Sequence, residues 1–143
     1  MRYGEFLVEV SRQKVDELRE MMAVFVPFAQ GIIGLEKVPR IVLKSHILTG
    51  DQPTMGRFHN EAYTLEVAIE DRHPVDVLRT LAHELCHAHQ YNINHEVDGT
   101  TGSDDEDEAH VMSGVIMRYF NKKYPQFLLK KALTDGRKPR SSV

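Results

Sequence analysis

The first half of the chain begins with a helical pattern of apolar positions. Between residues 11 and 30 apolar side chains recur every three or four positions, which is the spacing of one helix face. They are Val15, Leu18, Met22 and Phe25 or Val26. Ser11 is the expected N-cap of this helix, and Gly31 lies near its expected end.

Strand-like segments follow Pro39. The run over residues 40–48 is rich in Ile, Val and Leu, residues 50–53 are typical of a turn, and a short strand is expected over residues 56–59. Residues 62–70 alternate between an apolar face and a mixed face. The apolar face holds Tyr63, Leu65, Val67 and Ile69, and the mixed face holds Thr64, Glu66, Ala68 and Glu70. This pattern predicts a sheet that is packed on one face and exposed on the other, and it also suits an edge strand.

Two further helices are expected in the second half of the chain. Residues 74–91 are predicted to be helical, with a proline in the first turn, and a loop follows over residues 92–103. The next helix begins at about Glu106, and a last short helix is expected over residues 125–133. Apolar positions of the Glu106 helix are Ala109, Met112, Val115, Ile116 and Tyr119. The order of helix, strands and helices predicts an α+β fold with a small sheet of three or four strands.

Length and composition are ordinary for a globular domain. The 143 residues are 41% hydrophobic and 27% charged, and the net charge is −3. We expect one domain over residues 1–135 and a basic, flexible tail over residues 136–143. No apolar run approaches the roughly 20 residues of a membrane span, and the first residues lack the pattern of a signal peptide. A cytoplasmic protein that does not enter membranes is therefore expected.

Charge is distributed unevenly along the chain. Residues 96–108 hold seven acidic side chains and no Lys or Arg, whereas residues 118–143 hold eight Lys or Arg and a single acid, Asp135. A solvated acidic loop and a solvated basic helix end explain this distribution. The alternative is a basic tail that binds a partner protein or nucleic acid.

Residues 83–87 read His-Glu-Leu-Cys-His, an H-E-x-x-H pattern inside a predicted helix. Side chains four positions apart lie one above the other on a helix, so His83 and His87 can direct two imidazole nitrogens at one metal ion. Zinc accepts nitrogen ligands at about 2.0–2.1 Å in a tetrahedral shell. Glu84 projects about 100° away from His83, from where its carboxylate can act on a metal-bound water as a general base. The alternative is a pair of surface histidines without a metal.

The rest of this helix has an apolar stripe on the side opposite His83 and His87, so these histidines are expected to face a cleft. The stripe consists of Leu78, Leu81, Ala82, Leu85 and Ala88. Cys86 is the only cysteine of the sequence, so no internal disulfide can form. We expect it to be a small buried residue rather than a nucleophile.

A catalytic zinc usually has three protein ligands and one water, so a third ligand must lie beyond the motif. The candidates are His95, Glu106, Glu108 and His110, because His89 lies too far around the helix. We favour Glu106, which follows a loop long enough to reverse the chain and begins the next helix, where the helix dipole favours a carboxylate. Glu108 is the main alternative, with His110 behind it. A solvated acid without a metal is the other explanation of Glu106.

Two residues after Glu106 support this choice. Ala109 has a small side chain that would let its helix approach the metal helix closely. His110 lies four positions after Glu106, on the same helix face. From there it can hydrogen-bond a zinc-bound imidazole as a supporting group.

With these residues, the chain resembles the gluzincin metallopeptidases. The pattern H-E-x-x-H-x18-E is typical of the aminopeptidase N type and is one residue short of the thermolysin type; it is formed by His83, Glu84, His87 and Glu106. Residues 106–110 are similar to the E-x-E-A-N element of ImmA/IrrE-like peptidases, with His110 in place of the Asn. The resemblance implies a zincin-like fold, one Zn²⁺ ion and Glu84 as the catalytic residue.

Residues 78–91 and the preceding strand region are also similar to SprT-like metallopeptidases. A single cysteine excludes the cysteine-rich zinc ribbon that those proteins often carry, and no His-Gly pair follows the motif. The specific resemblance covers residues 56–113. In zincins the strand before the metal helix often lies at the cleft edge and pairs with an extended peptide. Residues 62–70 hold that place in this chain, and the alternative is that they form a purely structural edge strand.

These expectations converge on a zinc metalloendopeptidase that hydrolyses a protein or peptide substrate. The oxyanion would be held by zinc and one further donor, for which Tyr91, Tyr119 and His110 are candidates. A zinc-binding regulatory or interaction domain without turnover is one alternative, although the intact Glu84 argues against it. The others are a protease that cuts one partner protein, as the ImmA-like resemblance implies, and a DNA-associated protease of the SprT kind, as the basic C-terminus suggests.

Overall fold

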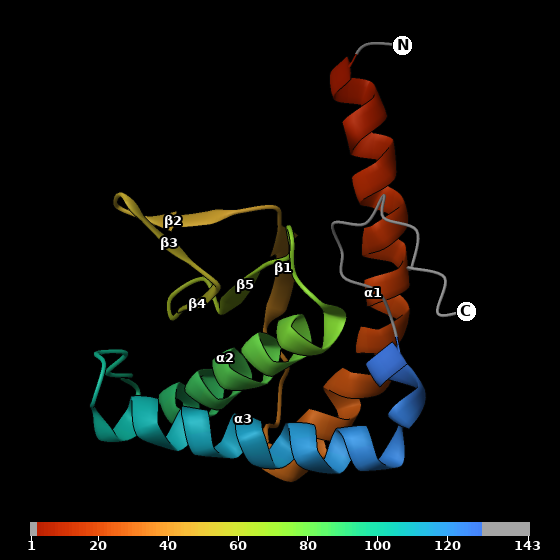
Figure 1. Ribbon diagram of the computed structural model, residues 1–143. Coiled ribbons are helices and arrows are strands. Elements are labelled where there is room, and N and C mark those ends of the chain that lie inside the picture. Colours follow the sequence, from red (N-terminus) through yellow and green to blue (C-terminus); the bar gives the residue numbers. More distant parts are fainter. Residues whose placement is uncertain (1–2, 130–143) are drawn as a thin grey trace.

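The structure is a computed structural model that describes residues 3–129, with the side chains of residues 15–128 (Figure 1). The α-helices are α1 (Tyr3–Ile33), α2 (Pro74–Asn94) and α3 (Asp104–Lys123), and η1 (Pro125–Leu129) is a 3-10 helix. The strands are β1 (Arg40–Lys44), β2 (Ile47–Thr49), β3 (Gln52–Thr54), β4 (Gly56–His59) and β5 (Thr64–Ala68). The predicted α+β class is confirmed.

Strand β5 lies in the middle of a three-stranded sheet. The strand order is β1-β5-β4, with β1 parallel and β4 antiparallel to β5, while β2 and β3 form a separate antiparallel pair. The prediction that residues 62–70 form an edge strand with an exposed face is therefore wrong. Both faces of β5 are buried, because ion pairs with Lys44 and Arg57 cover the carboxylate of Glu66 on the mixed face.

The apolar run over residues 40–48 forms two strands instead of the one that was predicted. β1 ends at Lys44, and Ile47 begins β2 in the other sheet. The turn that follows consists of Gly50, with φ of +63°, and Asp51, so the rest of the predicted turn belongs to β3. Apolar composition cannot show where a strand changes its partner, because strand preference depends on the neighbouring strands.

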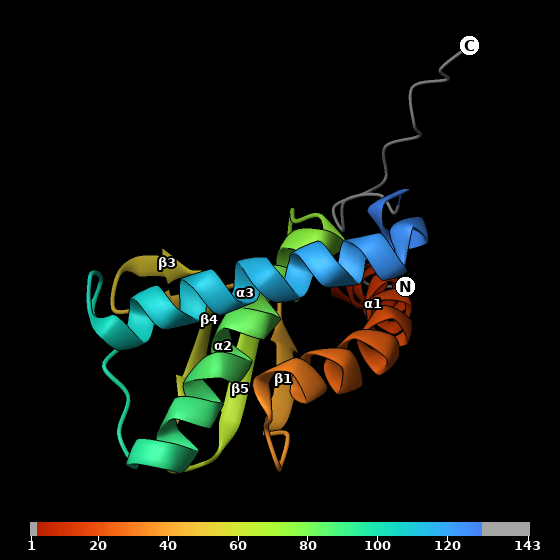
Figure 2. The ribbon, with the colours of Figure 1, turned by 90° about the horizontal axis from the view of Figure 1, so that it is seen from below.

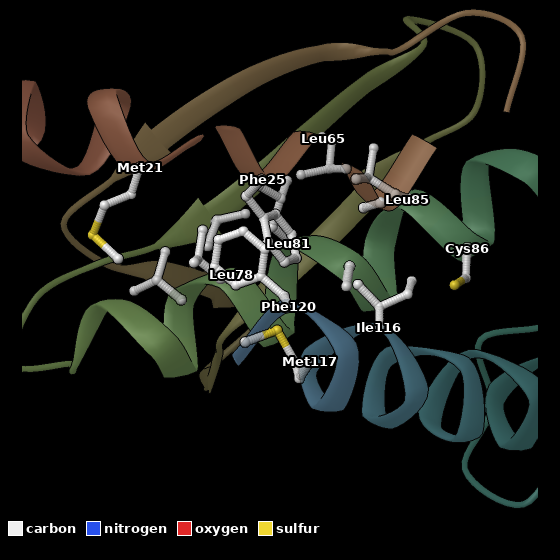
Figure 3. Close-up of a cluster of buried hydrophobic side chains, with 14 of the residues drawn as sticks. Met21, Phe25, Leu65, Leu78, Leu81, Leu85, Cys86, Ile116, Met117 and Phe120 are labelled. Carbon is white, nitrogen blue, oxygen red and sulfur yellow. The ribbon is translucent and has the colours of Figure 1, made fainter. Parts of the chain in front are cut away.

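Helix α2 is the central element of the fold. It lies between the three-stranded sheet and α3, and α1 packs beside both helices (Figures 1 and 2). Its predicted apolar stripe is confirmed, because Leu78, Leu81, Ala82, Leu85 and Ala88 are all fully buried. Figure 3 shows the three leucines of this stripe grouped with Phe25 of α1, Leu65 of β5 and Phe120 of α3. The side of α2 that bears His83, Glu84 and His87 lines a hollow instead.

The starts of α2 and α3 are fixed by side chains. Nδ1 of His73 accepts a hydrogen bond from the N–H of Val75 at 3.0 Å, and α2 begins with its proline as predicted. Oγ of Ser103 accepts a hydrogen bond from the N–H of Glu106 at 3.1 Å. This cap starts α3 at Asp104, two residues before the predicted start.

Helix α1 is longer than predicted. Ser11 lies inside the helix instead of capping it, and the helix runs past Gly31 until Gly34, whose φ of +80° ends it. Beyond η1, the end of the helix predicted over residues 125–133 and the tail predicted over residues 136–143 lie outside the described residues. None of the described helices is long and apolar enough to cross a membrane.

Candidate metal centre

The predicted metal ligands converge between α2 and α3. His83 and His87 lie one helical turn apart, and their side chains are 13% and 6% exposed. Nε2 of His83 lies 2.9 Å from Oε1 of Glu106, and Nε2 of His87 lies 2.9 Å from Oε2 of the same carboxylate. The fold therefore gathers these three side chains in a largely buried cluster and does not leave the two histidines on an open helix surface.

Glu106 reaches the imidazoles because α3 begins beside α2 and packs closely on it. It lies in the first turn of α3, where the N-terminal end of the helix dipole favours a carboxylate. Ala109 is fully buried in the core. Its small side chain lets α3 pack closely on α2, as predicted.

His110 lies at the outer side of the cluster. Its ring centroid is 4.6 Å from that of His83, and its Nε2 is 3.5 Å from Oε1 of Glu106. The potential ligand atoms of His83, Glu106 and His110 all lie within 4.8 Å of one another. The side chain of His110 is nevertheless 69% exposed, so it is placed as an additional group beside the ligands, open to the cleft.

A glutamine that the motif did not single out supports the cluster from behind. Gln90 is 3% exposed, and its Nε2 donates hydrogen bonds to the backbone oxygen of Asp105 and to Oε1 of Glu108, both at 2.9 Å. Because both partners are acceptors, the orientation of the amide is determined, and its Oε1 accepts a hydrogen bond from Nδ1 of His87 at 2.7 Å. The only sequence signal for this role is its position three residues after His87 on the same helix.

The hydrogen bond from Nδ1 of His87 to Gln90 places the ring proton on Nδ1 and leaves Nε2 to face Glu106. A neutral imidazole with its proton on Nδ1 has an unprotonated Nε2. That nitrogen and the carboxylate oxygen 2.9 Å away are both electron-rich, so a proton or a cation between them is favoured. In a tetrahedral zinc shell with bonds of about 2.0–2.1 Å, donor atoms lie about 3.3 Å apart. The two imidazole–carboxylate distances of 2.9 Å are close to that spacing, so the chemistry of these donors suits a zinc ion.

Other candidate ligands lie away from the cluster. Glu108 bonds to Gln90 and supports His87 indirectly. His95 is exposed and forms the C-cap of α2, with φ of +61°. His89 lines a separate cavity together with Cys86 and Glu108, so it faces another side of α2, as predicted.

Cys86 is buried in the core, 4% exposed, as predicted. Burial raises the pKa of its thiol to about 12. A thiol with so high a pKa carries almost no thiolate at neutral pH and is a poor nucleophile.

The electrostatics of the cluster favour a neutral imidazole and a proton-accepting carboxylate. Burial lowers the pKa of His83, and the neighbouring His87 acts in the same direction, although Glu106 opposes them. A neutral imidazole is the form that binds metals. Burial also raises the pKa of Glu84 to about 7. A carboxyl group with a pKa near neutrality is suited to take up and release protons in catalysis.

A glycine in β4 makes room for Glu84. A Cβ atom placed on Gly56 would lie 2.6 Å from Cγ2 of Thr80 and 3.3 Å from Cγ of Glu84, so a larger residue would collide with α2. The absence of a side chain therefore lets β4 approach α2 at the carboxylate.

Two hollows that share lining residues lie at the cluster. The larger has a volume of about 720 Å³ and extends along β4 and the loop after α2, and the smaller, of about 440 Å³, extends toward the β2–β3 pair and α3. His83, Glu84 and Glu106 line both. Among the three suggested oxyanion donors, His110 lines the smaller hollow, whereas Tyr91 and Tyr119 line neither.

No protein-family model, curated protein or solved structure shows a match to this chain. The chemistry of the cluster is therefore the main basis for a functional assignment.

Proposed function

We propose that the protein is a zinc-dependent metalloendopeptidase of the zincin type. The observation that carries the proposal is that the Nε2 atoms of His83 and His87 each lie 2.9 Å from an oxygen of Glu106, with the buried carboxylate of Glu84 beside them in a cleft. His83, His87 and Glu106 would hold the ion. When bound, zinc polarises the scissile carbonyl and lowers the pKa of water.

Glu84 and His110 carry the remaining steps in this proposal. Glu84 takes a proton from the attacking water and passes it to the leaving amine, a role that its pKa of about 7 supports. His110 lines the cleft and is exposed enough to donate a hydrogen bond to the oxyanion. Gln90 keeps the imidazole of His87 oriented.

Strand β4 is the element on which an extended peptide would bind, in place of β5. It is at the edge of the sheet within the described residues. The N–H of Ala68 donates a hydrogen bond to the carbonyl of Met55 at 2.8 Å, which shows which residues of β4 direct their backbone groups at β5. By the alternation of an antiparallel pair, Phe58 directs its backbone N–H and carbonyl away from β5. These groups can pair with a substrate backbone at the larger hollow.

The cleft continues on both sides of the cluster, which supports cleavage inside a chain over removal of terminal residues. A substrate that passes through the centre can occupy the hollow along β4 on one side and the hollow beside the β2–β3 pair on the other.

Glu84→Gln and His83→Ala test the proposal. We expect Glu84→Gln to retain stoichiometric zinc while cleavage of an unfolded protein substrate falls by roughly 10²–10⁴-fold, the usual contribution of general acid–base catalysis. His83→Ala should lose both zinc and cleavage. Cleavage at the wild-type rate by Glu84→Gln would exclude Glu84 as the general base.

The same measurements separate the alternatives. Bound zinc without cleavage of any protein or peptide in a broad screen would favour a zinc-binding regulatory domain. Cleavage that requires DNA, and that is lost when residues 134–143 are removed, would favour a DNA-associated protease.

A further inference from the structure

The outer face of the sheet carries a network of charged side chains next to the cleft. Glu66, 6% exposed, lies at its centre. Its carboxylate receives Nζ of Lys44, Nε of Arg57 and Nε2 of His59, each at 2.6 Å. Hydrogen bonds from His59 and Lys44, with Arg57 nearby, lower the pKa of Glu66 to about 2. The carboxyl group of Glu66 is therefore ionised at neutral pH.

The network has an excess of positive charge. Lys44 and Arg57 carry two positive charges against the single charge of Glu66. The side chains of Arg57 and His59 are 38% and 40% exposed and line the larger hollow, together with His83 and Glu84. Arg57 donates from Nε to Glu66 at 2.6 Å and from Nη1 to the backbone oxygen of Leu48 at 3.5 Å. Its Nη2 is left to receive a carboxylate from a bound peptide.

Strand geometry determines which substrate side chains would meet these groups. A Cβ on Gly56 would point at α2, so Arg57 and His59, at alternate positions, point to the opposite face of β4. A peptide added to the free edge of β4 would place every second side chain on that outer face. The side chains in between would point inward, toward the carboxylates of Glu84 and Glu106.

We propose that the cleft selects extended peptide segments that carry acidic side chains at alternate positions, with Arg57 as the specificity-determining residue. The proposal rests on the proposed function in that it uses the same peptide-binding edge of β4. A nucleic acid strand fits less well, because its charges are not confined to one face and would also meet the inner carboxylates.

Binding of three labelled peptides of equal length to full-length Glu84→Gln protein, at low ionic strength, tests the proposal. The first peptide alternates Glu with Thr, the second has the same composition with its Glu residues in one block, and the third has Gln in place of Glu. We expect the alternating Glu peptide to bind more tightly than the Gln peptide by roughly 2- to 5-fold, as one favourable cross-strand pair with Arg57 would give. The block peptide should fall between them.

Variants assign the effect to Arg57. Arg57→Gln, which keeps a donor for Glu66 without the charge, should weaken binding of the alternating Glu peptide by roughly 2- to 5-fold and leave the Gln peptide unchanged. Arg57→Ala should act in the same direction. Arg19→Ala is the matched control, because Arg19 lies on α1 and its side chain is 69% exposed.

Three outcomes would overturn the proposal: equal affinity for the Glu and Gln peptides, no effect of either Arg57 variant, or tighter, Arg57-dependent binding of a single-stranded oligonucleotide. Because binding is measured without turnover, selective binding by a protein that never cleaves would refute only the proposed function. Cleavage without any preference for acidic segments would refute only this inference.

Discussion

Nδ1 of His87 donates a hydrogen bond to Oε1 of the buried Gln90 at 2.7 Å. The same amide donates to the backbone oxygen of Asp105 and the carboxylate of Glu108. One side chain therefore both orients an imidazole on α2 and holds the first turn of α3, which carries Glu106. Residues that support metal ligands in this way typically contribute strongly to metal affinity.

Replacing Gln90 should weaken zinc binding without removing any ligand. We expect Gln90→Met, which keeps the size but loses both hydrogen-bonding functions, to lower zinc affinity by roughly 10–100-fold. Competition with a chromophoric chelator measures the effect. Asn94→Ala, one turn further along α2 at an exposed position, is the control and should bind zinc as the wild type does. An unchanged affinity in Gln90→Met would show that His87 needs no support.

The N-cap of α3 should matter for both stability and metal binding. Ser103→Ala removes the acceptor for the N–H of Glu106 and should destabilise the protein by about 1 kcal/mol. Ser103→Thr retains the hydroxyl and should keep most of the stability. Urea unfolding of the metal-free proteins measures the difference, and zinc titration shows whether the loosened turn also weakens the site. Equal stability of the Ala and Thr variants would contradict the capping role.

Alanine should have opposite effects at two glycines, because Gly56 lies at the contact of β4 with α2 whereas Gly114 has open space around it. Gly56→Ala should destabilise the protein by about 1–3 kcal/mol, since its Cβ would lie 2.6 Å from Cγ2 of Thr80. Gly114→Ala on α3 meets nothing within 4 Å and should stabilise by roughly 0.5–1 kcal/mol. Adding Thr80→Ser, which removes the colliding methyl group, should restore part of the stability of Gly56→Ala. Thermal unfolding of these variants checks the signs.

Glu66 predicts how stability responds to acid. Its pKa is lowered from 4.5 to about 2 in the folded protein, so its contribution is fully present above pH 4.5 and is lost as the pH falls toward 2. Because Lys44 and Arg57 are 45% and 38% exposed, solvent screening reduces this contribution to about 1–2 kcal/mol.

Urea unfolding at pH 7 and at several values between 4.5 and 2 tests this prediction. Glu66→Gln should be less stable than the wild type at pH 7, and the difference between them should shrink as the pH falls. Glu17→Gln, on the exposed side of α1, should leave the pH dependence unchanged. A constant difference between Glu66→Gln and the wild type at every pH would mean that packing, not charge, explains the role of Glu66.

Local sequence patterns predicted the helices well and the sheet less well. The apolar stripe of α2 and its proline-initiated start follow from helical spacing and from the fixed φ of proline, and both occur as predicted. The run over residues 40–48 was divided between two sheets. Strand order and strand ends depend on partners that are distant in sequence, and alternation does not identify those partners.

Glu66 illustrates the same difficulty at the level of one residue. A glutamate on the mixed face of a strand predicted exposure, yet Glu66 is 6% exposed. Its burial depends on Lys44 and Arg57, which reach it from the two neighbouring strands. A buried charge is retained when such partners surround it, and no feature of residues 62–70 alone indicates them.

The sequence by itself determined the H-E-x-x-H spacing, which puts His83 and His87 on one helix face, and the helix start that suits a carboxylate at Glu106. These are local properties, set by 3.6 residues per turn and by capping. Only the tertiary structure decided that Glu106 meets both imidazoles, that Gln90 orients His87, and that β4 instead of β5 borders the cleft. Those relationships depend on how helices and strands pack across long stretches of chain, where burial and partner choice outweigh local preference.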